Sequence, residues 1–158
     1  MPAAPPRSRD TTIILDHLRR LVQTLRESSR AAEAAHGVTG AQLFVLRTLA
    51  GSHALSLNEV AARTHTHQST VSVVVKRLVA RRLVRRTTSA VDARRVALTL
   101  TERGRQVLAR APLAAQDRLV AGLESLPPRR RRQLATELAQ LVGTMGLTDA
   151  MPAMFFED

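Results

Sequence analysis

Residues 56–101 read SLNEVAARTHTHQSTVSVVVKRLVARRLVRRTTSAVDARRVALTLT, and this stretch decides the fold. It begins with a capping box, because the Ser56 hydroxyl can accept a hydrogen bond from one free backbone N–H group while the Glu59 carboxylate accepts from another. Leu55 and Val60 flank the box with the spacing of a hydrophobic staple. The sequence therefore predicts that a short helix begins at this serine.

A second helix is predicted after a break at Thr64 to His67. Apolar residues then recur with the spacing of an amphipathic helix, at Val71, Val74, Val75, Leu78 and Val79. The opposite face is polar near its N-terminus and cationic further along, and consists of Gln68, Ser69, Ser72, Lys76 and Arg77. Such a face suits a helix that lies in the major groove with its first turns at the base edges.

Two short β-prone runs, residues 83–88 and 95–100, surround a turn-rich stretch and predict a hairpin, or wing. In the returning run Val96, Leu98 and Leu100 alternate with Arg95, Ala97 and Thr99, so one face is expected to rest on the helices. At the tip, Asp92 and Arg94 are close enough in sequence to pair.

Two interpretations of the tip remain open. In one, Asp92 aims a guanidinium group into a minor groove while Arg86 or Arg95 reaches a phosphate. In the other, the carboxylate and Arg94 form only an exposed ion pair worth about 0–1 kcal/mol.

The positive charge of the chain is concentrated in this same region. Residues 76–105 hold ten Lys or Arg against two acids, a net charge of +8 that leaves +3 for the rest of a chain whose total is +11. A local excess of this size favours a polyanionic partner, bound with strong salt dependence. The alternative is a solvated surface in an arginine-rich protein.

The order of the motifs resembles the MarR family of winged helix-turn-helix regulators. The matching segments cover about residues 38–104 and are Val38–Leu46, Leu57–Ala61, Gln68–Ser72, Leu83–Arg86, Asp92–Arg95 and Leu100–Gly104. The resemblance implies a homodimer, a major-groove helix drawn from Thr66 to Arg81, a wing carrying Asp92 and Arg94, and usually repression relieved by a small ligand.

From the motifs and the resemblance together we expect a mainly α protein with a small β-hairpin wing. Asp92 is expected to support the wing. The expected DNA-contacting residues are Thr66, His67, Gln68, Ser69, Thr70, Ser72, Val73, Lys76, Arg77, Arg86, Arg94 and Arg95.

Two residues depart from the family pattern. Arg82 stands where the family often has a glycine that closes the recognition helix, so either the helix ends differently or Arg82 adopts a left-handed conformation. Val73 stands where relatives tend to place a polar or basic side chain, and contact with a thymine methyl group can replace one hydrogen bond there.

The flanking segments predict dimerisation helices around a DNA-binding domain at 38–101. We expect a disordered tail at 1–10, a helix at 11–37, further helices at 102–146 and a second tail at 147–158. A second capping box at Thr39 and Gln42 opens the domain. One copy would leave the terminal apolar stripes partly uncovered, so pairing is expected through Ile14, Leu18, Leu21, Leu134, Leu138 and Leu141. Such a dimer predicts a palindromic operator with half-sites ~10 bp apart.

The sequence allows three further predictions about the C-terminal part of the chain. Pro112 should kink or break the helix in which it lies. Arg129–Arg132 is expected to be solvated or paired with carboxylates, with direct DNA contact as the alternative. Met151–Phe156 is expected to pack on its own dimer or, if exposed, to form a partner site.

Several classes of function are disfavoured. The chain has no cysteine, so thiol redox sensing is excluded. His65 and His67, two residues apart, do not share a helical face and lack an evident third ligand, so neither a metal nor a cofactor is expected. No catalytic spacing is recognisable, no run approaches a membrane span, and 2% aromatic residues disfavour single-strand or RNA binding. We expect a cytoplasmic protein that is not an enzyme.

Two functions remain open. The first is a sequence-specific regulator of transcription, which the resemblance implies is a repressor, released by a small-molecule effector that binds between the lobes. The second is an architectural DNA-binding protein with little sequence preference and no effector. Gln68, Ser69, Thr70 and Ser72 favour the first, because a protein that binds only phosphates would not require them. The sequence does not indicate which residues bind an effector.

Overall fold

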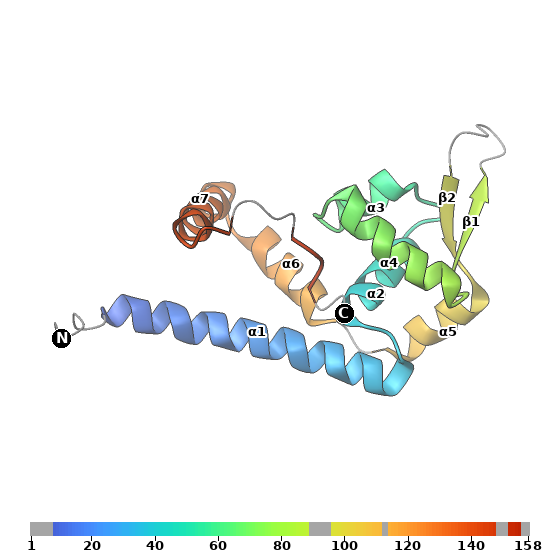
Figure 1. Ribbon diagram of the computed structural model, residues 1–158, viewed down its shortest axis with the longest axis horizontal. Coiled ribbons are helices and arrows are strands. Elements are labelled where there is room, and N and C mark those ends of the chain that lie inside the picture. The colour runs from blue at the N-terminus through green and yellow to red at the C-terminus, as the bar shows by residue number, and fades with distance from the viewer. Residues whose placement is uncertain (1–7, 89–95, 112–113, 148–151, 156–158) are drawn as a thin grey trace.

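The computed structural model describes residues 8–88, 96–111, 114–147 and 152–155. One long helix lies beneath a compact helical unit that carries a hairpin at its far end (Figure 1). The elements in chain order are α1 Arg9–His36, α2 Gly40–Ala50, α3 Leu57–Arg63, α4 Gln68–Ala80, β1 Val84–Thr88, β2 Val96–Leu100, α5 Glu102–Arg110, α6 Ala115–Ser125 and α7 Pro128–Thr144. The predicted mainly helical fold with a β-hairpin is confirmed.

The helix boundaries follow from their caps. α1 begins two residues before the predicted Thr11, because the Ser8 hydroxyl accepts from the Asp10 N–H group, and it ends at Gly37 with φ 63°. Both predicted capping boxes are present, with Thr39 and Gln42 opening α2 and Ser56 and Glu59 opening α3. Each box satisfies two N–H groups that the first helical turn leaves without partners.

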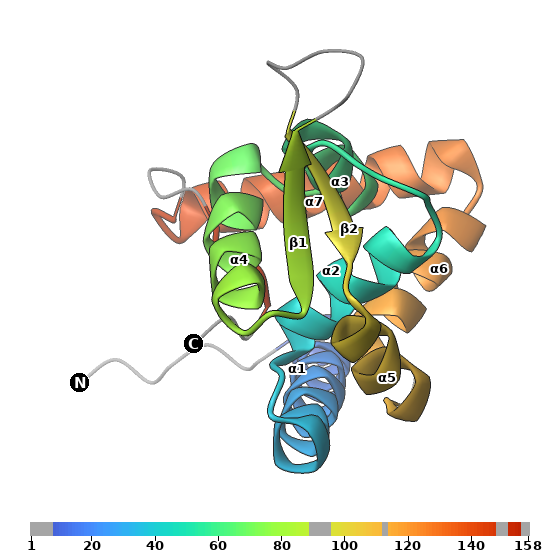
Figure 2. The same ribbon diagram turned by 90° about the vertical axis from the view of Figure 1, so that its right-hand side faces the viewer.

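α2 forms the centre of the core. It touches α1, α3, α4, α5, α6 and β2, and Val45 and Leu46 on it have no exposed surface. A helix that is apolar on nearly all sides must be buried on nearly all sides. The remaining elements of the compact unit therefore pack around α2 (Figure 2).

The hairpin is antiparallel, with Val84 opposite Leu100 and Thr88 opposite Val96. Leu55, just before α3, adds an isolated bridge to Leu98 through two backbone hydrogen bonds of 3.1 and 2.7 Å. Leu98 is buried, but Val96 is 47% exposed. The prediction that Val96 rests on the helices is wrong, because Val96, two residues further along β2 toward the outer end than the buried Leu98, is half exposed.

The turn from β2 into α5 depends on Gly104. A Cβ atom at this position would lie 2.2 Å from the carbonyl oxygen of Leu83, so a larger residue would separate α5 from the hairpin. Thr101 caps α5 by accepting from the Gly104 N–H group at 3.0 Å.

The C-terminal part breaks where the sequence predicts. α5 ends at Arg110 and α6 begins at Ala115, so the residues around Pro112 separate two helices. α7 starts with Pro128 in its first turn and buries no residue. Arg131 pairs with Glu124 of α6, as the carboxylate-paired interpretation of the arginine run expected.

The segment 152–155 packs on the protein itself. Met154 is buried within the main core cluster, while Phe155 is 49% exposed. None of the helices in the described residues is sufficiently long and apolar for a membrane span.

Candidate DNA-binding surface

The turn between α3 and α4 sets the direction of α4. α3 ends when the Thr66 N–H group donates to the Ala61 carbonyl at 3.0 Å, which places His65 at φ 52°. The Thr64 hydroxyl donates to the Val60 carbonyl at 2.8 Å. A single non-glycine residue in the left-handed region thus makes the sharp change of direction that brings α4 across α3.

α4 divides into the two predicted faces. The apolar stripe is confirmed, since Val71, Val74, Val75 and Leu78 have no exposed surface. Most of the predicted contact residues lie on the outside: Ser72 and Thr66 are half-buried, and His67, Gln68, Ser69, Val73, Lys76 and Arg77 are exposed. Val73, at 46% exposed, lies on this outer face, as a contact with a thymine methyl group would require.

Thr70 departs from the prediction. It is 9% exposed, and its hydroxyl donates to the Pro152 carbonyl at 3.4 Å. The expectation that Thr70 faces the groove with Gln68 and Ser72 is therefore wrong for this structure, because the C-terminal segment covers it.

The end of α4 explains how the chain manages without the expected glycine. Arg82 adopts φ 58°, and the Leu83 N–H group donates to the Leu78 carbonyl at 3.0 Å, so the second of the two predicted alternatives holds. The Arg82 carbonyl accepts from the Thr101 hydroxyl at 2.7 Å. These bonds fix the direction in which β1 leaves the helix.

The cations near this end of α4 do not all face outward. Arg81 donates to the Gly37 carbonyl and, at 3.0 Å, to the side-chain oxygen of Gln42, so it ties α4 to the start of α2. Lys76, Arg77 and Arg82 are exposed.

Besides the exposed cations of α4, the hairpin has two exposed arginines on β1, Arg85 and Arg86. Arg86 lies directly opposite the buried Leu98 in the register, but Arg86 is itself exposed; the strand of Leu98 is also covered by its bridge to Leu55. Asp92, Arg94 and Arg95 lie outside the described residues. The exposed cationic side chains thus lie on α4 and on β1, two elements in contact with each other.

An ion pair that sequence reasoning missed joins α2 to α6. Arg47 Nε and Asp117 Oδ2 are 3.1 Å apart, and both side chains are largely buried. Arg47 also donates to the Ala111 carbonyl at 3.1 Å. Burial raises the pKa of Asp117 above its ordinary value of 3.8, although the Arg47 charge and a backbone hydrogen bond at Ala114 act to lower this pKa. Only the fold brings these residues together, and no local spacing signals their pairing.

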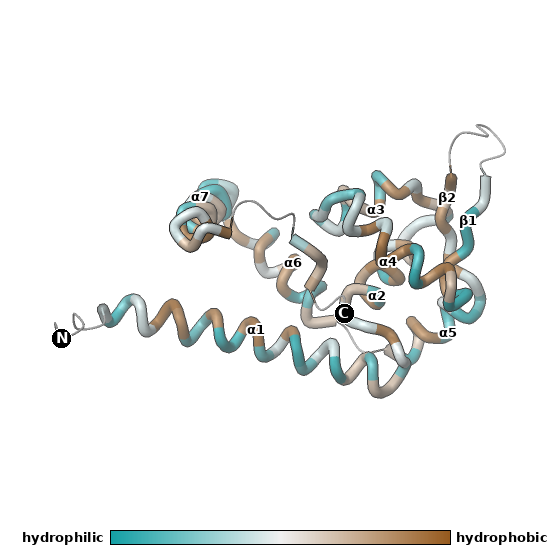
Figure 3. The backbone as a smooth tube through the Cα atoms, viewed as in Figure 1, coloured by the Kyte–Doolittle hydropathy of each residue, from teal (hydrophilic) through white to brown (hydrophobic). Residues whose placement is uncertain are grey.

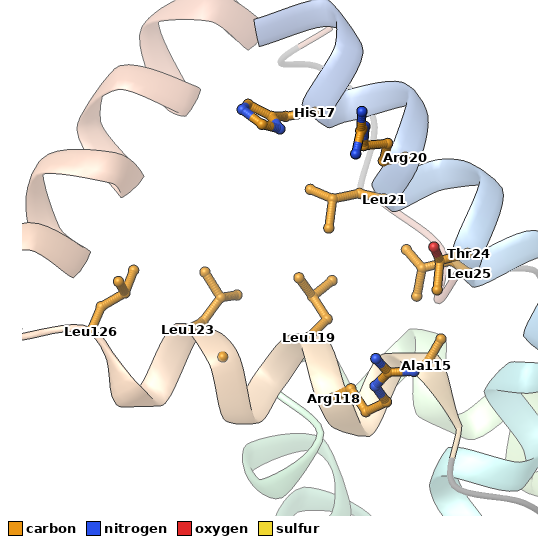
Figure 4. Close-up of a pocket in the computed structure, with 11 residues that line it drawn as sticks. His17, Arg20, Leu21, Thr24, Leu25, Ala115, Arg118, Leu119, Leu123 and Leu126 are labelled. Atoms are coloured by element: carbon orange, nitrogen blue, oxygen red, sulfur yellow. The ribbon is translucent and has the colours of Figure 1, made fainter. Parts of the chain in front are cut away.

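A groove that was not predicted from the sequence lies between α1 and α6 (Figure 4). Its volume is about 560 Å³, and leucines from both helices line it. His17 and Arg20 from α1 and Arg118 from α6 add nitrogen donors to this apolar lining. The groove therefore combines apolar contact area with positive charge.

The predicted dimerisation residues lie at the surface of the single chain. Ile14 is 53% exposed, Leu21 46% and Leu138 42%; Leu134 and Leu141 are exposed and Leu18 is half-buried. Figure 3 shows hydrophobic positions recurring along α1 well outside the compact unit. Within the part of the chain that the structure describes, no group of three His, Asp or Glu residues is arranged to hold a metal ion.

The chain is similar to known regulators of transcription. A model of the MarR family matches residues 36–95. The HTH-type transcriptional repressor MdtR of Bacillus subtilis (strain 168) is 34% identical over 87 residues, which cover 55% of this chain and 56% of that repressor. The chain thus matches only about half the length of this relative.

Two solved structures extend the likeness to nearly the whole chain. The YusO protein of Bacillus subtilis is 30% identical and has a TM-score of 0.52, with 87% of this chain and 99% of that chain covered. BpsR of Bordetella bronchiseptica, whose DNA binding is regulated by 6-hydroxynicotinic acid, is 26% identical and has a TM-score of 0.54, with 85% and 98% covered.

Proposed function

The chain belongs to the MarR family, and from this premise we propose that it is a regulator of transcription that binds duplex DNA in a sequence-specific way. It acts as a homodimeric repressor, is released by a small molecule, is located in the cytoplasm and catalyses no reaction. One observation carries the proposal: α4 exposes Gln68 and Lys76 with the half-buried Ser72 between them on the same side, and it packs against β1, which exposes Arg85 and Arg86.

The chemistry of this face supports base recognition as well as phosphate binding. Gln68 can form a bidentate hydrogen bond to an adenine edge, worth about 1–3 kcal/mol of discrimination against the wrong base. Lys76 and Arg86 carry charges that suit phosphates on either side of the groove. An architectural protein needs only the charges.

Competition binding separates the regulator from the architectural alternative. We expect the duplex upstream of the protein's own coding sequence to be bound at least ~10³-fold more tightly than random duplex. Equal displacement by random duplex would contradict the regulator and favour the architectural protein.

Two substitutions test the assigned roles. Gln68→Ala should relax specificity at one base pair of each half-site, whereas Lys76→Ala should weaken binding to all duplexes and reduce the slope of log K against log salt by about 1. Arg30→Ala, an exposed cation on α1, is the matched control and should change neither quantity.

For the effector we propose an organic anion with an aromatic body, bound in the groove between α1 and α6. Arg20, Arg118 and His17 suit a carboxylate, and the leucines suit a ring. That BpsR responds to 6-hydroxynicotinic acid, an aromatic carboxylic acid, supports this chemical class.

Titration with aromatic carboxylates, nicotinate and benzoate derivatives among them, tests this site. Saturating ligand should release the parent protein from DNA, and Arg118→Gln should weaken this response at least tenfold because a charge-assisted bond is lost. If Arg118→Gln instead lowers the mass of the particle in solution, the groove holds a second copy rather than an effector.

A further inference from the structure

The C-terminal segment Pro152–Phe155 lies against the helix assigned to the major groove. Figures 1 and 2 both show it beside α4, and the Thr70 hydroxyl donates to the Pro152 carbonyl at 3.4 Å. This contact joins residues 82 positions apart in the sequence.

Met154 anchors the segment. It is 4% exposed and belongs to the same buried cluster as Val71 and Val74 of α4, whereas Pro152, Ala153 and Phe155 are exposed. A flexible thioether side chain is suited to fill an irregular gap in a core. Met154 is therefore the buried side chain by which the segment enters the core.

The position of this contact along α4 matters. Thr70 lies in the first turn, between the groove-facing Gln68 and Ser72. On its other sides α4 is supported by α2, β1 and α3, and α3 is only seven residues long. Side chains that read base edges must be held to within about 0.5 Å, so support at this turn affects binding without any contact to DNA.

We propose that the segment Pro152–Phe155 positions α4 for DNA recognition, with Met154 as its anchor and Thr70 as the point of contact. This inference rests on the proposed function of α4. It assigns Thr70 to the support of the helix and removes it from the residues that read bases.

The test compares variants of the full chain at a temperature at which all are folded. Met154→Ser should bind the operator about tenfold more weakly, the loss of roughly one well-formed base contact, with the salt slope unchanged. In the absence of DNA its amides at residues 68–75 should exchange hydrogen faster. Met154→Leu, which conserves volume, should restore binding to within about twofold.

Two controls separate positioning from stability and from direct contact. Val107→Ala shortens a side chain that packs on the same core from α5, and it should lower the unfolding temperature without weakening DNA binding. Thr70→Val removes the hydrogen bond to Pro152 but keeps the Met154 anchor, so it should weaken operator binding by less than about threefold. A loss of about tenfold or more would mean that Thr70 reads a base directly, and would overturn its assignment to the support of α4.

Unchanged exchange in α4 of Met154→Ser, or unchanged operator affinity of that variant, would overturn the inference. A change of about 1 in the salt slope would also overturn it, because the segment would then contribute a phosphate contact. If the parent protein binds no duplex, it is the proposed function that fails, and hydrogen exchange alone decides whether the segment positions α4.

Discussion

At the residue scale, the two helices of the DNA-binding unit share an unusual ending. α3 closes with His65 at φ 52° and α4 closes with Arg82 at φ 58°. A left-handed conformation costs a residue with a Cβ atom about 1–2 kcal/mol. His65 lies in the turn before α4 and Arg82 in the turn after it. The backbone is therefore strained at both turns that set the direction of α4.

Arg82→Gly should therefore make the protein more stable. The gain from the relieved strain is reduced by about 0.4–1 kcal/mol because glycine adds freedom to the unfolded chain, so we expect a net gain of up to about 1 kcal/mol. Urea unfolding would show it as a higher midpoint with an unchanged slope.

Arg82→Ala is the matched control, because it removes the same charge and keeps the Cβ atom. It should leave the unfolding free energy nearly unchanged. An alanine variant as stable as the glycine variant would show that the side chain of Arg82, and not its backbone conformation, limits stability.

At the scale of elements, the ion pair between Arg47 and Asp117 joins the centre of the core to α6. Its carboxylate has a raised pKa, because the loss of hydration on burial outweighs the attraction of the guanidinium group. A carboxyl group whose pKa is higher in the folded state binds more protons when folded. Its contribution to stability is therefore greatest at low pH and is lost as the pH rises through the interval above 3.8.

The substitution Asp117→Asn tests this pH dependence of the unfolding free energy. At pH 3.5 the parent carries a mostly neutral carboxyl group, so the two proteins should have similar unfolding free energies. As the pH rises to 7 the variant should become the more stable protein, because it has no charge to desolvate. The measurement is the difference in unfolding free energy between the two proteins at each pH. A difference that favours the parent at pH 7 would mean that the attraction of Arg47 prevails.

The elements also show why some features could be predicted from the sequence and others could not. The capping boxes at Thr39 and Ser56 depend on residues three positions apart, so local spacing predicts them. The contacts of Leu55 with Leu98 and of Thr70 with Pro152 depend on the folding of the whole chain.

The same distinction applies to the candidate site. Helical periodicity placed the apolar stripe of α4 correctly, because a period of 3.6 residues separates two opposite faces. It could not place Thr70, which lies near the boundary between these faces and is covered by a distant segment. The groove between α1 and α6 was missed for a similar reason, since its lining comes from residues about 100 positions apart.

At the scale of the whole molecule, the single chain leaves its terminal helices incomplete. α7 buries no residue, and Leu134, Leu138 and Leu141 lie along one face of it at 38–42% exposure. The N-terminal half of α1 exposes Ile13, Ile14 and Leu21 in the same way. Exposed apolar stripes on two helices are typical of an interface, and a second copy offers the same surfaces in return.

Leu138→Glu should therefore separate the two copies, because it places a charge in the middle of the apolar face of α7. Light scattering at micromolar concentration should then give the mass of one chain, whereas the parent should give that of two. Operator affinity should fall by about 10² or more, since the second half-site no longer benefits from the binding of the first.

Gln140→Glu introduces the same charge on the opposite face of α7, and it should leave both the mass and the affinity unchanged. If both variants remain dimeric, the copies pair through another surface. If Leu138→Glu is monomeric but binds the operator as tightly as the parent, each half-site is recognised independently, and the ~10 bp spacing expected of the operator would lose its physical basis.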